Sequence, residues 1–296
     1  MAVDETARQA VTDLRPLMVS IAYRMVGSIS EAEDLVQEAF LRLHQEGAVE
    51  NPRAWLTTVT TRLAIDHLRS ARVRREQYPG TWLPEPVLAD PAPDAAIRAE
   101  TLSYAVLVLL ERLSPVERAV FVLREALDYG YDEIAEIVGK SEANCRQLAS
   151  RARRHVGERK RRFEAPRDLV RRFIDALHQG ETQPLVELLA ADVEFSGDGG
   201  GKAPAVGRPM RGAEAVARML AGFSRVGRRR DITARPVEVN GGPGLVLFED
   251  KRLVAVWAFE LSDGAIEAIH GVVNPDKLAH ISRTILPSLP PALKRS

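Results

Sequence analysis

The stretch Tyr131-Asp132-Glu133-Ile134-Ala135-Glu136-Ile137-Val138-Gly139-Lys140-Ser141 decides the fold of the middle of the chain. Its apolar residues recur at helical spacing, and Gly139 suits the left-handed turn that ends a helix. Ser141 then offers a side chain that can cap the start of a second helix. Two helices joined by a glycine turn, with the small Ala135 where they cross, predict a helix-turn-helix.

The second of these helices is predicted to have two different faces. An apolar stripe for packing consists of Cys145, Leu148, Ala149, Ala152 and Val156. The opposite stripe carries side chains that suit DNA, because arginine pairs with guanine edges or phosphates and glutamine pairs with adenine. The predicted DNA-contacting residues are Arg146, Gln147, Ser150, Arg151, Arg153 and Arg154. An ordinary helical hairpin with a basic surface is the alternative interpretation.

A net charge of zero conceals strong local charge. The 296 residues include 41 Lys or Arg and 41 Asp or Glu. Residues 53–75 hold six arginines against one acid, and residues 140–162 hold nine basic residues against two acids. Residues 85–136 hold eleven acids against four arginines. Separate basic and acidic segments are typical of a protein that binds both nucleic acid and another protein.

Composition also excludes several classes of protein. The single cysteine, Cys145, excludes an internal disulfide framework and a zinc site built from cysteines. The longest apolar run, residues 105–110, is too short to cross a bilayer. The first residues carry acids where a signal peptide carries Lys or Arg. We therefore expect a cytoplasmic, monomeric protein with no membrane contact, no cofactor and no metal site.

The first 163 residues are predicted to form helices interrupted by one linker. Residues 6–77 have helical periodicity, with an N-cap at Ser30 and a further helix starting at Pro52. Five prolines between Pro79 and Pro93 exclude a helix, so residues 78–95 are assigned as a linker. Residues 96–163 are helical again.

After Pro166 the pattern changes to an α+β domain over residues 167–286. Predicted helices cover residues 167–179, 183–190 and 213–226. Alternating apolar positions predict strands at residues 193–195, 232–239, 245–248, 253–261 and 266–273, separated by turn signals. The strands are expected to form one curved antiparallel sheet. Residues 287–296 are predicted to be a disordered tail.

Three motifs in the helical part resemble one family of bacterial proteins, the extracytoplasmic-function (ECF) sigma factors of RNA polymerase. Residues 32–43, AEDLVQEAFLRL, resemble the family's region 2 helix that docks on the polymerase clamp. Residues 52–56, PRAWL, and 62–69, RLAIDHLR, resemble its promoter-melting stretch. Residues 113–118, LSPVER, followed by the helix-turn-helix, resemble region 4. The resemblance implies core polymerase and promoter DNA as partners.

This resemblance assigns region 2 to residues 6–77 and region 4 to residues 96–163. Region 2 is expected to bind the −10 promoter element and region 4 the −35 element. The polymerase-binding candidates are Asp34, Leu35, Gln37, Glu38, Phe40 and Leu41. On the −10 side, Asp66, His67 and Arg69 are expected to face bases, and Arg62, Arg72, Arg74 and Arg75 to face phosphates.

The carboxyl-terminal block resembles a SnoaL-like domain, a conical α+β fold, joined to sigma factors in one ECF group. The resemblance implies that this domain regulates the sigma factor in cis by contacting the linker. The matching motifs are Trp82, Leu83, Pro84, Glu85 and Pro86; Asp198, Gly199, Gly200, Gly201 and Lys202; and Asn274, Pro275, Asp276, Lys277 and Leu278. Trp82 is expected to be the apolar anchor, and Glu85 to pair with Lys202.

Two other functions remain open at the level of sequence. A helix-turn-helix regulator could bind DNA without polymerase. The conical domain could instead bind a small apolar ligand or be an enzyme, with Asp192, Glu194, Asp198 and His270 as candidate acid–base groups. All five tyrosines lie before this domain, which removes one common oxyanion donor, so no catalytic residue is assigned.

Overall fold

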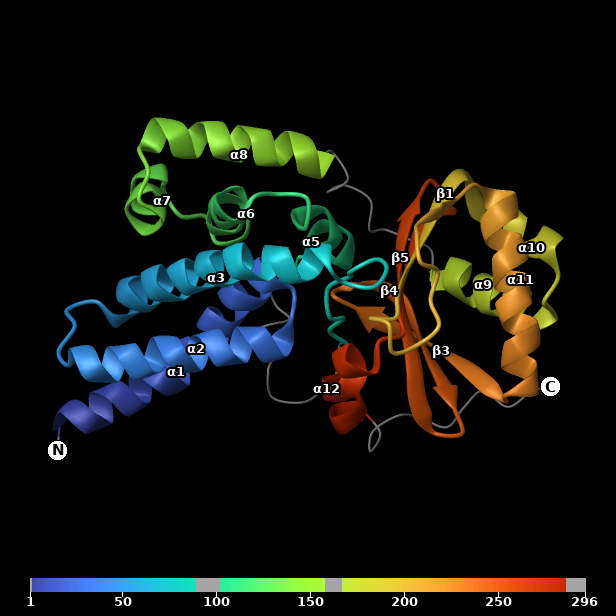
Figure 1. Cartoon of the computed structure of the whole chain (residues 1–296), viewed down its shortest axis with the longest axis horizontal. Coiled ribbons are helices and arrows are strands. Elements are labelled where there is room, and N and C mark those ends of the chain that lie inside the picture. Colours follow the sequence, from blue (N-terminus) through green and yellow to red (C-terminus); the bar gives the residue numbers. More distant parts are fainter. Residues whose placement is uncertain (1, 89–101, 158–166, 286–296) are drawn as a thin grey trace. The chain divides into compact units, whose positions relative to one another are not determined.

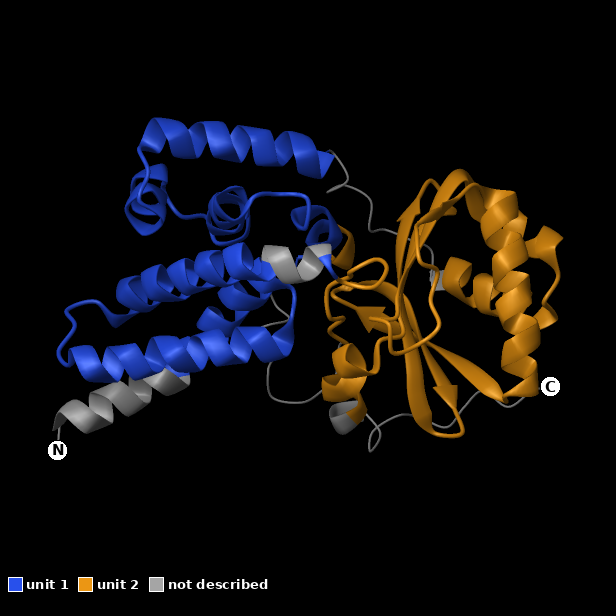
Figure 2. Cartoon of the chain, viewed as in Figure 1, with its two compact units in different colours: residues 1–77, 91–102, 106–160 blue, residues 78–90, 103–105, 161–296 orange. Residues whose placement is uncertain are grey.

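The computed structural model describes residues 2–88, 102–157 and 167–285. In residues 2–12, 72–76, 167 and 283–285 it describes the backbone alone. The chain divides into two compact units, which Figure 2 shows in blue and orange. Unit 1 comprises residues 1–77, 91–102 and 106–160, and unit 2 comprises residues 78–90, 103–105 and 161–296. No helix among the described residues is long and apolar enough to span a membrane.

Unit 1 begins with three long helices, α1 (Ala2–Val26), α2 (Ile29–Glu46) and α3 (Pro52–Glu76), which pack against one another. The predicted start of α3 at Pro52 is confirmed, and the Asn51 side chain accepts a hydrogen bond from the Ala54 N–H at 3.1 Å. The predicted cap at Ser30 is wrong. Ser28 caps α2, because its hydroxyl accepts from the Glu31 N–H.

The rest of unit 1 contains the helix-turn-helix. The elements are α5 (Tyr104–Leu110), whose first two residues belong to unit 2, α6 (Pro115–Phe121), the π-helix η1 (Val122–Ala126), α7 (Tyr131–Val138) and α8 (Glu142–Val156) (Figure 1). Ser114 and Glu117 form a reciprocal capping box at the start of α6. As predicted, Gly139 ends α7 with a left-handed φ of 66°, and the Ser141 side chain caps α8.

Unit 2 is built on a six-stranded sheet with the order β2-β1-β6-β5-β4-β3. The strands are β1 (Leu189–Asp198), β2 (Met210–Arg211), β3 (Ile232–Val239), β4 (Gly242–Glu249), β5 (Arg252–Ser262) and β6 (Ala265–Val272). The helices are α9 (Arg167–Gln179), α10 (Thr182–Val186), α11 (Ala213–Arg229) and α12 (Pro275–Ile285). Figure 1 shows α9, α10 and α11 on one side of the sheet and α12 on the other.

Alternation along the strands separates an apolar inner face from a more polar outer face. On β5, Trp257 and Phe259 point to the inner face and join a core with Phe173 of α9 and Phe195 of β1. Phe173 lies 5.2 Å from Phe259 between ring centroids, in an edge-to-face arrangement. This core fixes α9 and α11 on the sheet and leaves the outer face for other contacts.

The sheet differs from the expected one in two respects. β1 pairs with β6 in parallel, whereas the other pairs are antiparallel. β1 also starts at Leu189, so the second helix of the domain ends at Val186 and does not reach Ala190. The side chain of Leu189 is buried in the core, and this long-range packing is not readable from local periodicity.

Two glycine substitutions should have opposite effects on stability. Gly139→Ala forces an L-residue into a left-handed conformation and should destabilise the helix-turn-helix by roughly 1–2 kcal/mol. Gly222→Ala lies inside α11, where an added methyl group meets open space, and should stabilise unit 2 by roughly 0.5–1 kcal/mol. Urea unfolding followed by circular dichroism measures both changes; a shift of the same sign in both variants would contradict the assignment.

Candidate nucleic-acid interface and linker-binding site

The recognition helix α8 presents the predicted residues on its exposed face. Three of its arginines already have intramolecular partners: Arg146 pairs with Glu142 at 2.7 Å, Arg153 with Glu125 at 2.8 Å, and Arg151 lies 3.6 Å from Glu117. Gln147, Ser150 and Arg154 are exposed and have no intramolecular partner among the described residues. The paired arginines are held in defined directions, and the unpaired side chains are available to DNA.

Helix α8 is held in place by apolar packing and by ion pairs. Cys145 is fully buried, as predicted, and burial raises the pKa of its thiol. The hydrogen bond to Glu125 raises the pKa of Arg153, so this guanidinium stays charged. Burial alone would raise the pKa of Glu117, but its hydrogen bonds with Ser114 and the charge of Arg151 lower it overall. Glu117 therefore remains an anion that orients Arg151.

Asn144 is a candidate DNA-contacting residue that the sequence interpretation missed. It lies exposed in the first turn of α8, and its side chain has no partner among the described residues. Helix-turn-helix proteins contact base edges with the N-terminal residues of this helix. Its position in the first helical turn, three residues after the Ser141 cap, was the available signal.

The −10 candidates on α3 are not equally available in this structure. Asp66 and Arg69 form an exposed ion pair at 3.0 Å, and His67 Nε2 lies 3.2 Å from a carboxylate oxygen of Glu31. Arg62 donates to two backbone carbonyls of α7. The side chains of Arg72, Arg74 and Arg75 lie outside the described residues. These assignments to the −10 element remain predictions.

The polymerase-binding candidates form one surface of α2. Ala32, Val36, Ala39 and Leu43 are buried on the inner side of this helix. The candidates Asp34, Gln37, Glu38 and Leu41 are exposed, and Leu35 and Phe40 are half-buried. Leu41 is 51% exposed to solvent, which is unusual for a large apolar side chain. The combination of acids and apolar groups suits a protein partner.

The linker is held in unit 2 by the carboxylate of Asp198, which is completely buried. Asp198 Oδ1 accepts from the Tyr78 hydroxyl at 2.7 Å. Asp198 Oδ2 accepts from the Leu83 N–H at 2.8 Å and from Lys277 Nζ at 2.7 Å. Lys277 also donates to the Leu83 carbonyl and lies over the Trp82 ring, 3.8 Å from its centroid. Burial, with the hydrogen bond to Asp198, raises the pKa of Tyr78.

The glycine motif gives the linker room to approach. Gly200 and Gly201 have left-handed φ values of 57° and 71°. A Cβ on Gly200 would lie 2.2 Å from the Asn274 amide and 2.9 Å from the Tyr78 hydroxyl, and one on Gly201 would lie 3.0 Å from Pro79. These two positions therefore require glycine for both backbone and steric reasons.

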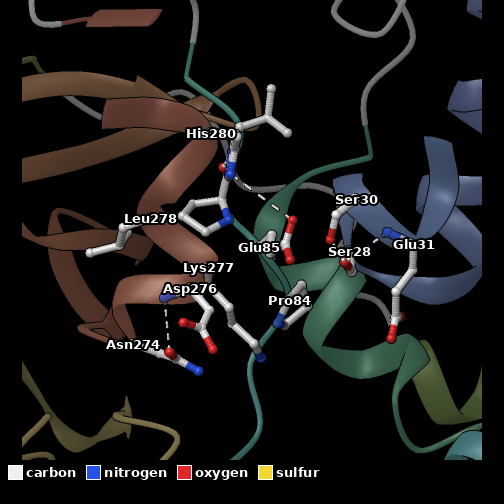
Figure 3. Close-up of polar contacts among 12 residues, drawn as sticks. Ser28, Ser30, Glu31, Pro84, Glu85, Asn274, Asp276, Lys277, Leu278 and His280 are labelled. Atoms are coloured by element: carbon white, nitrogen blue, oxygen red, sulfur yellow. Dashed lines mark hydrogen bonds and ion pairs between the residues drawn. The ribbon is translucent and has the colours of Figure 1, made fainter. Parts of the chain in front are cut away.

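Further contacts hold the linker beyond Leu83. Tyr104 donates to the Pro84 carbonyl at 2.7 Å, and His280 Nε2 lies 2.9 Å from the Pro86 carbonyl. The Val87 N–H donates to the Asn240 side chain, and Leu88 forms an antiparallel bridge with Val239 of β3. Figure 3 shows the imidazole of His280 turned toward the Glu85 carboxylate, 4.0 Å away. The linker thus lies on the outer side of the sheet.

The predicted meeting of the three motifs is found within unit 2, with two corrections. Trp82 is only half-buried, whereas Leu83 is 1% exposed and is the buried apolar anchor. Lys202 pairs with Asp276 and not with Glu85, which faces His280. In the Asn274 motif, Asn274, Lys277 and Leu278 are buried, whereas Pro275 and Asp276 are exposed.

Sequence reasoning did not identify Tyr78 as a linker residue that binds Asp198, nor did it identify Tyr104, Asn240 and His280 as residues that bind the linker. None of them lies in a motif, and each is far in sequence from its partner. The signal for Asn240 was its place in an Asn-Gly turn, which predicted only the turn itself.

The acid–base candidates of the conical domain do not face its interior. Glu194, Asp198 and His270 share the outer face of the sheet by strand register, and Asp192 is exposed. His270 Nε2 pairs with Glu260 at 2.8 Å, and its ring lies 5.8 Å from that of Tyr104. The described inward-facing cluster is apolar. Among the described residues no group of three or more His, Cys, Asp or Glu is placed to hold a metal ion.

These features define a helical protein with a helix-turn-helix and an appended α+β domain, and comparison with known families agrees. The sequence matches Sigma-70 region 2 over residues 10–74, Sigma-70 region 4 over residues 103–156 and a SnoaL-like domain over residues 170–273. The chain belongs to the ECF RNA polymerase sigma factors.

Two relatives from Mycobacterium tuberculosis match over nearly the whole chain. The ECF sigma factor SigJ of strain H37Rv is 41% identical over 283 residues, covering 89% of this chain and 90% of SigJ. The probable ECF sigma factor SigI of the same strain is 35% identical, covering 89% and 92%. The crystal structure of SigJ matches with a TM-score of 0.75 at 36% identity, covering 94% of this chain and 98% of that one.

Substitutions on α8 should separate base reading from phosphate binding. Gln147→Ala should relax discrimination at one base pair of the upstream promoter element, by about 1–3 kcal/mol. Arg154→Ala should weaken binding to all sequences alike and lower the slope of log affinity against log salt by about 1. Binding of the polymerase complex to promoter variants at several salt concentrations measures both. A uniform loss from Gln147→Ala would overturn its role in base reading.

Proposed function

We propose that the SnoaL-like domain regulates this sigma factor in cis by holding the linker between region 2 and region 4. The observation that carries the proposal is the buried Asp198 carboxylate, which binds Tyr78, Leu83 and Lys277 together. Breaking a contact of this kind is costly, because removing one partner leaves a buried charge uncompensated. The contact attaches the SnoaL-like domain to the linker, whose length limits how far region 2 and region 4 can separate.

Binding of the linker to unit 2 shortens the part of the linker that can span the distance between region 2 and region 4. An extended chain spans about 3.3–3.6 Å per residue, so a free linker reaches far. With residues 78–88 bound in unit 2, this part of the linker cannot extend between region 2 and region 4. Separation of region 2 from region 4 on a promoter then requires either release of the linker or a new path for it. We expect the held state to limit transcription.

The site assignments complete the proposal. The exposed face of α2 binds the clamp of core polymerase, α8 binds the −35 element, and α3 binds the −10 element. The protein works in the cytoplasm, where polymerase and promoter DNA are, and acts as a binding protein rather than an enzyme. Glu194, Asp198 and His270 lie on the outer face of the sheet. Their side chains therefore cannot act on a substrate enclosed in the conical interior, which supports a role without catalysis. A small apolar ligand of that interior remains a prediction.

Breaking the buried ion pair should raise transcription. Lys277→Met removes the cation that Asp198 and the Leu83 carbonyl share, and should release the linker. Lys202→Met is the matched control, because its pair with Asp276 is exposed and contributes little. Run-off transcription with core polymerase on fragmented genomic DNA of the host measures the effect, which we expect to be several-fold for Lys277→Met and negligible for Lys202→Met.

Two further variants test whether an effect of Lys277→Met arises from misfolding rather than from release of the linker. Tyr78→Phe removes one hydrogen bond to Asp198 at nearly constant volume and should change transcription in the same direction by less. A chain that ends at Phe163 removes the whole domain. If both variants and Lys277→Met transcribe as the parent does while remaining folded, cis regulation through the linker is wrong. Transcription that does not depend on added core polymerase or on this chain would contradict the role in initiation.

A further inference from the structure

Tyr131, the first residue of α7, contacts three arginines of region 4. The guanidinium carbons of Arg124 and Arg146 each lie over its ring, 5.3 Å from the ring centroid. Arg153 Nη2 donates to its hydroxyl at 3.3 Å. The face of an aromatic ring attracts a cation, and the hydroxyl oxygen accepts a hydrogen bond. The ring and the hydroxyl of Tyr131 therefore have different cationic partners.

The ring of Tyr131 is held in place by its surroundings. Tyr131 is half-buried and packs against the buried apolar cluster shared by α6, η1, α7 and α8. Arg124 of η1 is itself anchored, because its Nη1 donates to the Tyr129 carbonyl at 2.8 Å and lies 3.1 Å from a carboxylate oxygen of Asp128. Apolar packing and an anchored cation thus fix the ring relative to α8.

The two partners of Tyr131 on α8 lie on one side of that helix. Arg146 and Arg153 are seven residues apart, which is about two helical turns and about 10 Å along the axis. Each also has an acidic partner: Glu142 lies 2.7 Å from Arg146, and Glu125 lies 2.8 Å from Arg153. Each guanidinium is therefore held both by a carboxylate and by Tyr131.

The contact with the ring leaves Arg146 able to bind DNA. A guanidinium has five N–H donors, and its attraction to an aromatic face depends on its charge and not on a hydrogen bond. The bond to Glu142 is made by Nη2, and the side chain of Arg146 is 57% exposed. A guanine edge accepts two hydrogen bonds from one arginine. An arginine that is already oriented loses less conformational entropy when it binds.

We propose that Tyr131 is a positioning residue for promoter recognition: its ring orients Arg146 toward a base edge of the −35 element, and its hydroxyl orients Arg153 toward a phosphate. This inference deepens the proposed function, because it rests on binding of the −35 element by α8. The ring then determines how strictly one base pair is read. The hydroxyl contributes to affinity for every sequence, since phosphate contacts carry no sequence information.

Two substitutions separate the ring from the hydroxyl, and a third is the control. Tyr131→Leu removes both groups but leaves an apolar side chain for the cluster. Tyr131→Phe keeps the ring over which Arg146 lies and removes only the acceptor for Arg153. Tyr129→Leu is the matched control, because Tyr129 packs against the same apolar cluster and its hydroxyl faces Thr57 at 3.2 Å.

Base preference is measured with the full chain bound to core polymerase. The DNA is a promoter recovered by run-off transcription, with each base pair of the −35 element varied in turn. Arg146→Ala should lower the preference at one base pair on the order of tenfold. Tyr131→Leu should lower the preference at that same base pair about threefold. Tyr131→Phe and Tyr129→Leu should keep it.

Two further readouts separate positioning from a general loss of structure. Tyr131→Phe should weaken binding to all sequences alike, by up to about threefold. Tyr131→Leu combined with Arg146→Ala should lower the preference at the shared base pair no further than Arg146→Ala alone, because the ring acts there through Arg146. A purely structural role of Tyr131 would weaken binding to every sequence and leave the preference unchanged.

The outcomes distinguish this inference from the proposed function. If Arg146→Ala alters the preference but Tyr131→Leu, folded by circular dichroism, does not, the inference is wrong and the role of α8 stands. If Arg146→Ala leaves every preference unchanged, base reading by Arg146 is wrong and the inference fails with it. Loss of the preference in Tyr131→Phe would contradict the role of the ring. Should Tyr131→Leu not fold, Tyr131→Met replaces it with the same expectation, because an unbranched side chain fills irregular space.

Discussion

The buried carboxylate of Asp198 is the interaction on which the arrangement of unit 2 depends. It is completely buried, and a hydroxyl, a backbone N–H and an ammonium group all point at it and satisfy its two oxygens. Two of these donors, from Tyr78 and Leu83, belong to the linker. Without the linker, the Asp198 carboxylate at the end of β1 would therefore lack two of its donors. The linker is thus part of the SnoaL-like domain's structure as well as the connection between region 2 and region 4.

In both units, polar side chains form hydrogen bonds with backbone groups of another segment. In unit 2, Lys277 and His280 bind linker carbonyls. In unit 1, Arg62 and Arg118 bind carbonyls at helix ends. Such contacts are directional, so they fix an arrangement, and they are made by side chains that can find other partners such as phosphates or water. They suit a protein that has to change the spacing of its regions during its function.

The sequence was informative wherever a local rule applied. The helix-turn-helix could be predicted because Gly139 and Ser141 act on the backbone next to them. The strand β3 could be predicted from alternation, whereas the start of β1 depends on packing of Leu189 against distant residues. The three linker motifs could be placed together only through the family resemblance. The partners Tyr78 and Asn240, and the contact of Arg62 with α7, depend on tertiary contacts for which no local pattern exists.

The central claim is that the linker is bound, and amide hydrogen exchange at Leu83 tests it most directly. The Leu83 N–H donates to a buried carboxylate, so it should exchange slowly in the free chain, at a rate comparable to amides of the neighbouring sheet. In an Asp198→Asn variant it should exchange rapidly while amides of β4 and β5 stay protected. Exchange of the Leu83 amide at the rate of an unstructured peptide in the unmodified chain would contradict the claim.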